Sequence, residues 1–79
     1  MDPEKEAFLK RFGAHLKAHR QAKGLSTIEM ARLMHMDSGN FTRIESGKTN
    51  PTIITISTYC KVLEIGLEEL FKGFNPTKP

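Results

Sequence analysis

The segment from residue 38 to residue 46 carries side chains that could read the edges of base pairs. On a helix that turns by about 100° per residue, one side collects four small, hydroxyl-bearing or basic residues: Gly39, Thr42, Arg43 and Ser46. No acidic and no bulky apolar residue interrupts this side. An arginine placed there can donate two parallel hydrogen bonds to O6 and N7 of a guanine in the major groove. The spacing therefore predicts a DNA-reading surface, with an ordinary solvent-exposed face that happens to lack acids as the alternative.

The opposite side of the same segment indicates a helix packed on a core. Phe41, Ile44 and Glu45 share that side. Asp37 precedes the segment and is a favourable N-cap, and Gly47 follows it, where a left-handed residue often ends a helix. The first turn holds small residues that favour caps and turns over helix interiors. Such a turn makes sense if this end of the helix enters a groove.

A second short helix is expected immediately before this one. Residues 25–34 read "LSTIEMARLM", in which Ser26 and Glu29 have the Ser-x-x-Glu spacing of a capping box. Its apolar face is expected to contain three residues: Ile28, Ala31 and Met34. Residues 35–37 separate the two helices. Two short helices joined by three residues, the second polar at its start, are typical of a helix-turn-helix.

Three further segments are predicted to be helical. The first begins at residues 2–4 and ends at residues 23–24, the next opens at residues 50–52 and ends near Leu63, and the last covers residues 67–72. The two longer helices carry apolar residues at spacings of three and four: Phe8, Leu9, Phe12 and Leu16 on the first, and Ile53, Ile56, Cys60 and Leu63 on the second. Strand-type alternation is scarce, so the fold class is all-α.

Length and composition fit one small domain. The chain has 79 residues, of which 38% are hydrophobic, enough for one modest core. We predict a compact five-helix domain over residues 1–74 and a frayed C-terminal tail, with two prolines, over residues 75–79.

Charge and the absence of targeting signals narrow the possible partners. Twelve Lys and Arg against nine Asp and Glu give a net charge of +3, which mildly favours a polyanionic partner. The acidic N-terminus has no apolar stretch behind it, which argues against a signal peptide. No apolar run approaches the roughly 18–20 residues that span a bilayer. The sequence thus predicts a soluble, cytoplasmic protein without a membrane partner.

Arg20 and Glu45 are charged residues on two sides that are expected to face inward. Arg20 continues the stripe of the first helix four residues after Leu16, and Glu45 lies four residues after Phe41. An unpaired buried charge is very costly. We therefore predict an ion pair between Arg20 and Glu45 that orients the helix of residues 38–46. The alternative is that each side chain reaches solvent separately along its long stem.

Other candidate sites are weaker. His15 and His19 have the i, i+4 spacing of metal ligands, but no third ligand lies nearby, so no metal site is predicted. Cys60, the single cysteine, is expected to be a small core residue rather than a redox sensor. Nothing places a nucleophile beside a base, and no glycine-rich phosphate loop follows a strand. The sequence predicts no enzyme activity and no cofactor.

The chain also resembles a known family, the lambda-repressor-like, Cro/XRE-type helix-turn-helix DNA-binding domains. The resemblance runs from about Phe12 to Phe71 and consists of ordered pieces at matching spacings: Arg20, Leu25-Ser26, Ala31, Ile44-Glu45-x-Gly47, Asn50-Pro51 and Leu67-x-x-Leu70-Phe71. It implies a fold in which the third helix reads DNA, and it implies the same Arg20–Glu45 pair. The family usually has glycine in the turn where this chain has His35.

Carried over by position, the resemblance implies two sets of DNA contacts. The residues that face bases are Ser38, Gly39, Thr42 and Arg43. The residues that contact phosphates are Ser26, Thr27, Asn40, Ser46, Lys48 and Thr49. Helix N-termini and backbone N–H groups are favourable anion sites, which agrees with the second set.

The predicted function is sequence-specific binding of double-stranded DNA by a transcriptional regulator. One recognition helix covers only a few base pairs, so we expect a homodimer on a short palindromic operator. Its interface is expected among apolar residues left over from the core: Ile54, Ile65, Phe71 and Phe74. The alternative is an antitoxin-type interaction module that neutralises a toxin and regulates its own operon. A phage repressor or a restriction–modification controller would share the first mechanism.

Overall fold

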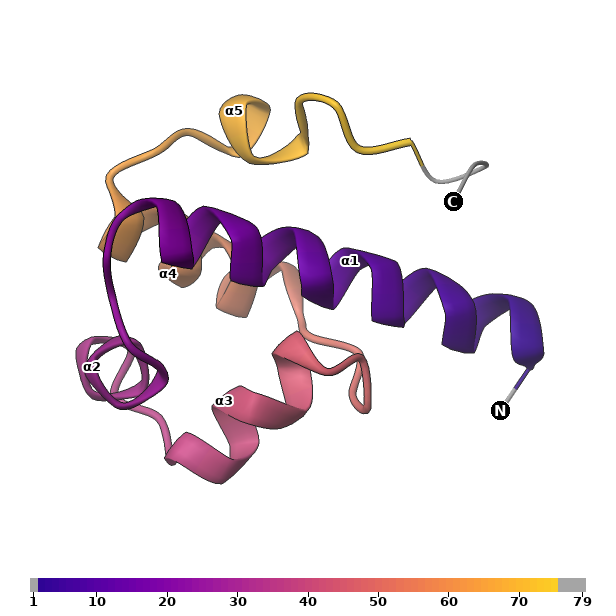
Figure 1. Ribbon diagram of the computed structural model, residues 1–79, viewed down its shortest axis with the longest axis horizontal. Helices are drawn as coiled ribbons and strands as arrows, with labels where there is room; N and C mark the ends of the chain where they lie inside the picture. The colour runs from indigo at the N-terminus through magenta and orange to yellow at the C-terminus, as the bar shows by residue number, and fades with distance from the viewer. Residues whose placement is uncertain (1, 76–79) are drawn as a thin grey trace.

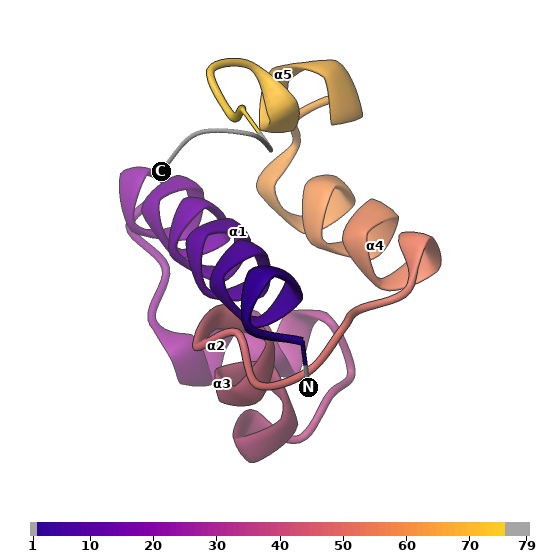
Figure 2. The same cartoon turned by 90° about the vertical axis from the view of Figure 1, so that its right-hand side faces the viewer.

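The long first helix crosses the middle of the molecule, and the other four helices are arranged around it (Figure 1). The computed structural model describes residues 2–75. Helix α1 (Pro3–Ala22) begins where Asp2 accepts a hydrogen bond from the Glu4 N–H at 2.8 Å and Pro3 occupies the first turn. Helix α5 lies on one side of α1, and α2 and α3 lie on the other, in both views (Figures 1 and 2).

Helices α2 (Thr27–Leu33) and α3 (Ser38–Glu45) form the predicted helix-turn-helix. The capping box at the start of α2 is present, with Ser26 and Glu29 bonded to each other's backbone N–H groups. Asp37 caps α3 as expected. In the turn between them, His35 takes the left-handed conformation, with a φ of 55°. Histidine tolerates this region better than most residues, so the turn forms without glycine.

Helices α4 (Ile53–Leu63) and α5 (Leu67–Phe71) complete the fold. The Thr52 side chain caps α4 by accepting a hydrogen bond from the Thr55 N–H at 3.1 Å. Glu64 ends α4 in the left-handed conformation, with a φ of 57°. The next residue, Ile65, donates its N–H to the Cys60 carbonyl at 3.1 Å, which makes a Schellman motif. The five predicted helices and the all-α class are therefore confirmed.

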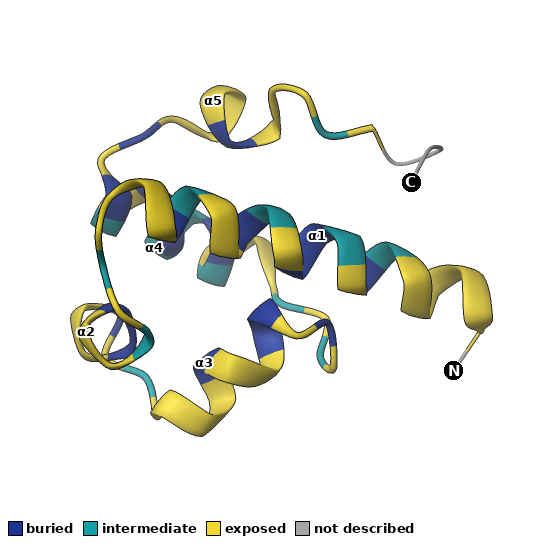
Figure 3. Ribbon diagram, viewed as in Figure 1, coloured by how far each residue is buried: buried dark blue, intermediate teal, exposed yellow. Residues whose placement is uncertain are grey.

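The core confirms most of the predicted apolar stripes and corrects four residues (Figure 3). Ile28 is exposed, because the short helix α2 turns only one narrow side, with Met30 and Ala31, to the core. Ile53 is also exposed, because it is the first residue of α4 and precedes the turn, with Ile56, that packs on the core. Ile65 is buried, since the residue after a left-handed helix end commonly folds back onto the last turn. Phe74 is half-buried and packs on three rings of α1: Phe8, Phe12 and His15. Residues 76–79 of the predicted tail lie outside the described residues.

Two glycines let α1 and α3 approach at backbone distance. A Cβ atom on Gly13 would lie 2.3 Å from the Glu45 carbonyl oxygen and 2.8 Å from that of Ile44. A Cβ atom on Gly47, which has a φ of +77°, would lie 2.5 Å from the Lys10 Cα atom. The atoms in the way belong to the backbone and cannot turn aside. Sequence reasoning did not identify Gly13, although a glycine inside a long helix costs up to about 1 kcal/mol relative to alanine and is a signal of close packing.

We predict that Gly13→Ala destabilises the fold by at least about 1–3 kcal/mol, despite the better helix propensity of alanine. The added methyl group must push α1 away from the end of α3. Urea unfolding followed by circular dichroism measures the change. Gly66→Ala is the matched control, because a Cβ atom there meets no atom within 4 Å and its φ is −81°. Equal stability of the two variants would contradict the close approach.

Candidate nucleic-acid interface

The outward side of α3 is exposed along its whole length (Figure 3). Its exposed residues are those that the sequence placed there: Ser38, Gly39, Asn40, Thr42, Arg43 and, at the end of the helix, Ser46. Phe41, Ile44 and Glu45 are buried on the other side. The structure therefore separates the predicted base-reading residues from the core.

The first turn of α3 presents little side-chain bulk, because it contains a glycine and is capped by the short Asp37 side chain. The Asp37 carboxylate accepts a hydrogen bond from the Asn40 N–H at 3.1 Å. Gly39 has no positive φ, and a Cβ atom on it would meet only the Asp37 Oδ2 atom, at 2.9 Å. Backbone strain therefore does not require glycine here. The space above Gly39 is open to a ligand, and alanine would need only a shift of the flexible cap side chain.

The predicted phosphate-binding residues outside α3 lie in two segments. Ser26 and Thr27 lie at the start of α2, and the loop that holds Lys48 and Thr49 follows the C-terminal end of α3 (Figure 1). Lys48 is exposed, whereas Thr27 and Thr49 are half-buried.

Two of these serines already make local hydrogen bonds. The Ser26 N–H donates to the Glu29 carboxylate at 2.9 Å, and the Ser46 hydroxyl donates to the Arg43 carbonyl at 3.3 Å. The Ser26 N–H and hydroxyl hold the pKa of Glu29 below its usual value. Glu29 thus takes part of the anion site at the start of α2, so a phosphate there depends on hydroxyl donors and on the remaining N–H groups.

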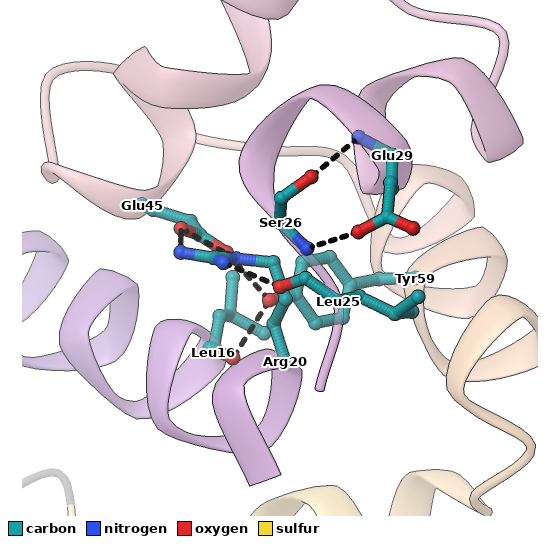
Figure 4. Close-up of polar contacts among 7 residues, drawn as sticks. All are labelled: Leu16, Arg20, Leu25, Ser26, Glu29, Glu45 and Tyr59. Carbon is teal, nitrogen blue, oxygen red and sulfur yellow. Dashed lines mark hydrogen bonds and ion pairs between the residues drawn. The ribbon is translucent and has the colours of Figure 1, made fainter. Parts of the chain in front are cut away.

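A buried ion pair fixes α3 against α1 (Figure 4). Arg20 Nε donates to Glu45 Oε2 at 3.0 Å, and Arg20 Nη2 donates to Glu45 Oε1 at 3.0 Å. This is the two-pronged geometry in which guanidinium and carboxylate fit best. The exposed fractions are 5% for Arg20 and 7% for Glu45. The predicted pair forms as expected, and the alternative of two solvent-seeking side chains is wrong.

The pair belongs to a larger polar cluster that joins four parts of the chain (Figure 4). Arg20 Nη1 donates to the Leu25 carbonyl before α2, at 2.7 Å. The Tyr59 hydroxyl of α4 lies 2.7 Å from Glu45 Oε2 and 2.6 Å from the Leu16 carbonyl of α1, and can donate its hydrogen to either. No buried side-chain nitrogen or oxygen among residues 2–75 lacks a hydrogen-bond partner. Every charge in the cluster is therefore compensated.

Sequence reasoning missed Tyr59. The available signal was its place three residues after Ile56 on the apolar stripe of α4, because a buried tyrosine hydroxyl needs a partner. Which partner it finds depends on how α4 crosses α1 and α3.

Arg20 keeps its charge and Tyr59 keeps its hydroxyl hydrogen at any working pH. Hydrogen bonds to Glu45 raise the pKa of Arg20 above its already high value. Burial, and then the hydrogen bond to Glu45, raise the pKa of Tyr59 well above 10. The phenol thus remains protonated and available as a donor.

The weaker candidates found no supporting site. His15 Nε2 bonds to the Leu70 carbonyl, and its ring lies 4.9 Å from that of His19. No group of three or more potential metal ligands gathers among the described residues. Cys60 is buried, and burial raises the pKa of its thiol, which disfavours the reactive thiolate. The same part of the chain contains no helix long and apolar enough to cross a membrane.

We predict that Arg20→Ala destabilises the fold by about 3–5 kcal/mol, because Glu45 would remain buried with its charge uncompensated. The double variant Arg20→Met, Glu45→Leu should recover much of this loss, since apolar groups replace both charges and Tyr59 keeps the Leu16 carbonyl as an acceptor. Urea unfolding of the single and double variants measures the coupling. Additive losses would show that the two residues do not interact.

Comparison with known proteins agrees with this geometry. Residues 11–70 match the family described as a helix-turn-helix domain. Among solved structures, the restriction-modification controller protein C.AhdI from Aeromonas hydrophila is similar, with a TM-score of 0.79 and 34% identity over 90% of this chain and 100% of that one. No match was found among curated protein sequences. The chain belongs to the helix-turn-helix domain family, in its lambda-repressor-like Cro/XRE branch, and is a DNA-binding regulator rather than an enzyme.

Proposed function

We propose that this protein regulates transcription as a homodimer on a short two-fold symmetric operator, with one α3 in the major groove of each half-site. The observation that carries the proposal is the outward side of α3, which is exposed, free of acids and held against the core by the Arg20–Glu45 pair. A rigid support matters because a binding constellation must be held to within about 0.5 Å.

The base-reading role falls on the outward residues of α3. Arg43 is the one long donor of the predicted set and suits a guanine. Ser38 and Thr42 are shorter donors and acceptors for neighbouring base edges. Gly39 leaves room for the helix backbone to approach a base or a thymine methyl group.

Phosphate contacts are proposed on both sides of this reading surface. Lys48 supplies a charge, and Ser26, Thr27 and Thr49 supply hydroxyl groups. Asn40 and Ser46 lie at the two ends of α3 and can reach the backbones that border the groove. Such contacts set orientation and general affinity rather than sequence preference.

The dimer surface is proposed at the start of α4. Two recognition helices on one DNA face must lie about 34–36 Å apart, so the interface has to be beside α3. Helix α5, with Phe71, lies on the far side of α1 from α3 (Figure 1). Helix α4 follows the loop that leaves α3, and its first two residues, Ile53 and Ile54, are 63% and 72% exposed. Large apolar side chains that share one exposed turn suit a contact surface.

The biological role that similarity favours is that of a controller in a restriction–modification system. The similar structure has that printed role, and the present chain covers all of it at 34% identity.

Selection of bound sequences from random DNA tests the proposed function. We expect a motif of two inverted half-sites whose centres lie about one helical turn apart. A single half-site without a symmetric partner would contradict the dimer model, and the recovery of no preferred motif would contradict sequence-specific binding.

We predict that Arg43→Ala weakens binding to the selected site by about 1–3 kcal/mol and relaxes the preference at one base pair in each half-site. Lys48→Ala, the control, should weaken selected and random DNA about equally and reduce the salt dependence of binding. Fluorescence anisotropy at several salt concentrations measures both. If Arg43→Ala leaves the ratio of the two affinities unchanged, Arg43 does not read a base.

We also predict that Ile54→Asp weakens self-association by about tenfold or more, because dimerisation would bury an unpaired carboxylate. Sedimentation of the protein without DNA measures the effect. Ile28→Asp on α2 is the control, because Ile28 is similarly exposed but lies on a different helix. The opposite result, with only Ile28→Asp impairing the dimer, would move the interface to α2.

A further inference from the structure

We infer that the Tyr59 hydroxyl is a positioning group that holds the recognition helix α3 in register with α4, and so sets the half-site spacing that the dimer accepts. The inference rests on the proposed homodimer. Tyr59 touches no DNA in this arrangement and acts through Glu45.

The contact between α4 and α3 is narrow, which gives Tyr59 its importance. Helix α3 packs most extensively against α1 and α2, whereas α4 packs most extensively against α5. Among the described residues, the only hydrogen bond that joins α4 to α3 runs from the Tyr59 hydroxyl to Glu45 Oε2. The Tyr59 ring, 1% exposed, stacks on Phe41 of α3 with centroids 6.0 Å apart. Parallel stacked rings can slide over each other, but a directed hydrogen bond limits that sliding.

Glu45 is held from two helices at once (Figure 4). The Arg20 fork of α1 fixes the carboxylate in the plane of the guanidinium. The Tyr59 hydroxyl approaches Oε2 from α4 and also lies within hydrogen-bond distance of the Leu16 carbonyl. Removal of the hydroxyl leaves the ion pair with α1 and the stacking on Phe41 intact but removes the directed bond between α4 and α3.

A small rotation of α3 about its C-terminal residue Glu45 produces a large displacement of its N-terminal residues, where base contacts are proposed. Glu45 is the last residue of the eight-residue helix α3, whose length is about 12 Å. A rotation of about 10° at this end would move Ser38 and Gly39 by about 2 Å, more than half the separation of neighbouring base pairs on one strand. Since the proposed dimer contact is also on α4, the Tyr59–Glu45 bond connects the two-fold axis to the reading surface.

The experiment compares Tyr59→Phe with wild-type protein on three operators: the selected site, and the same half-sites one base pair closer or one base pair further apart. Tyr59→Phe keeps the ring and its stacking on Phe41. We expect it to reduce the preference for the selected spacing by about threefold or more, because the loss of one net hydrogen bond loosens α3. Leu70→Val is the control, since it lowers stability through a buried residue of α5, which lies on the other side of α1 from α3 (Figure 1).

Each outcome decides the inference. Reduced spacing preference in Tyr59→Phe, with the wild-type preference kept in Leu70→Val, supports it. A folded Tyr59→Phe with the wild-type preference overturns it, and so does an equal loss in both variants. A Tyr59→Phe chain that does not fold would show that the hydroxyl serves stability rather than register, which also overturns the inference. Wild-type protein with no spacing preference would instead refute the proposed function, and the inference with it.

Discussion

The buried pair between Arg20 and Glu45 is the interaction on which the rest of the structure depends. Both charges are almost completely removed from water, so neither is tolerable without the other. Arg20 comes from the end of α1 and Glu45 from the end of α3, and the Arg20 guanidinium also donates a hydrogen bond to the Leu25 carbonyl at the entrance to α2. A single side chain thereby sets the positions of three helices. The pair need not add net stability to do this, because its directional bonds penalise other arrangements of the same helices.

The pair also demands close backbones, which explains two glycines far apart in the sequence. Gly13 and Gly47 let α1 lie directly on the end of α3, where any Cβ atom would meet backbone atoms. If α1 were held further away, the Arg20 fork would lengthen beyond hydrogen-bond range, and Glu45 would lose its compensation. Packing and electrostatics therefore specify one crossing of α1 and α3. This mutual support between local residue choices and tertiary contacts is expected of a sequence with one native structure.

Local signals in the sequence were enough to predict the helices and most of their caps, because each depends on spacing within one segment. The Arg20–Glu45 pair could be predicted because spacing within each helix placed both charges on inward sides, and the two signs are opposite. Tyr59 and Gly13 escaped prediction, since their roles depend on the helix that lies opposite them. The prediction that Ile65 is left over from the core is wrong for a related reason. Glycine is the usual left-handed residue at a helix end, and here Glu64 takes that conformation. The turn at Glu64 therefore gave no sign that Ile65 folds back into the core. The predicted DNA contacts remain predictions, because side-chain exposure shows what can meet a base but not which base.

The division of α3 into two sides has a consequence for how binding specificity can change. The residues that hold the helix in place, Phe41, Ile44 and Glu45, are buried, and none of them is a proposed base contact. The proposed contacts at Ser38, Thr42 and Arg43 are exposed, and substitutions at such positions usually alter stability by no more than about 0.5 kcal/mol. The preferred operator can therefore change without loss of the fold. Gly39 is the exposed position where size matters most, because a larger side chain there would both fill the space open to DNA and displace the Asp37 cap.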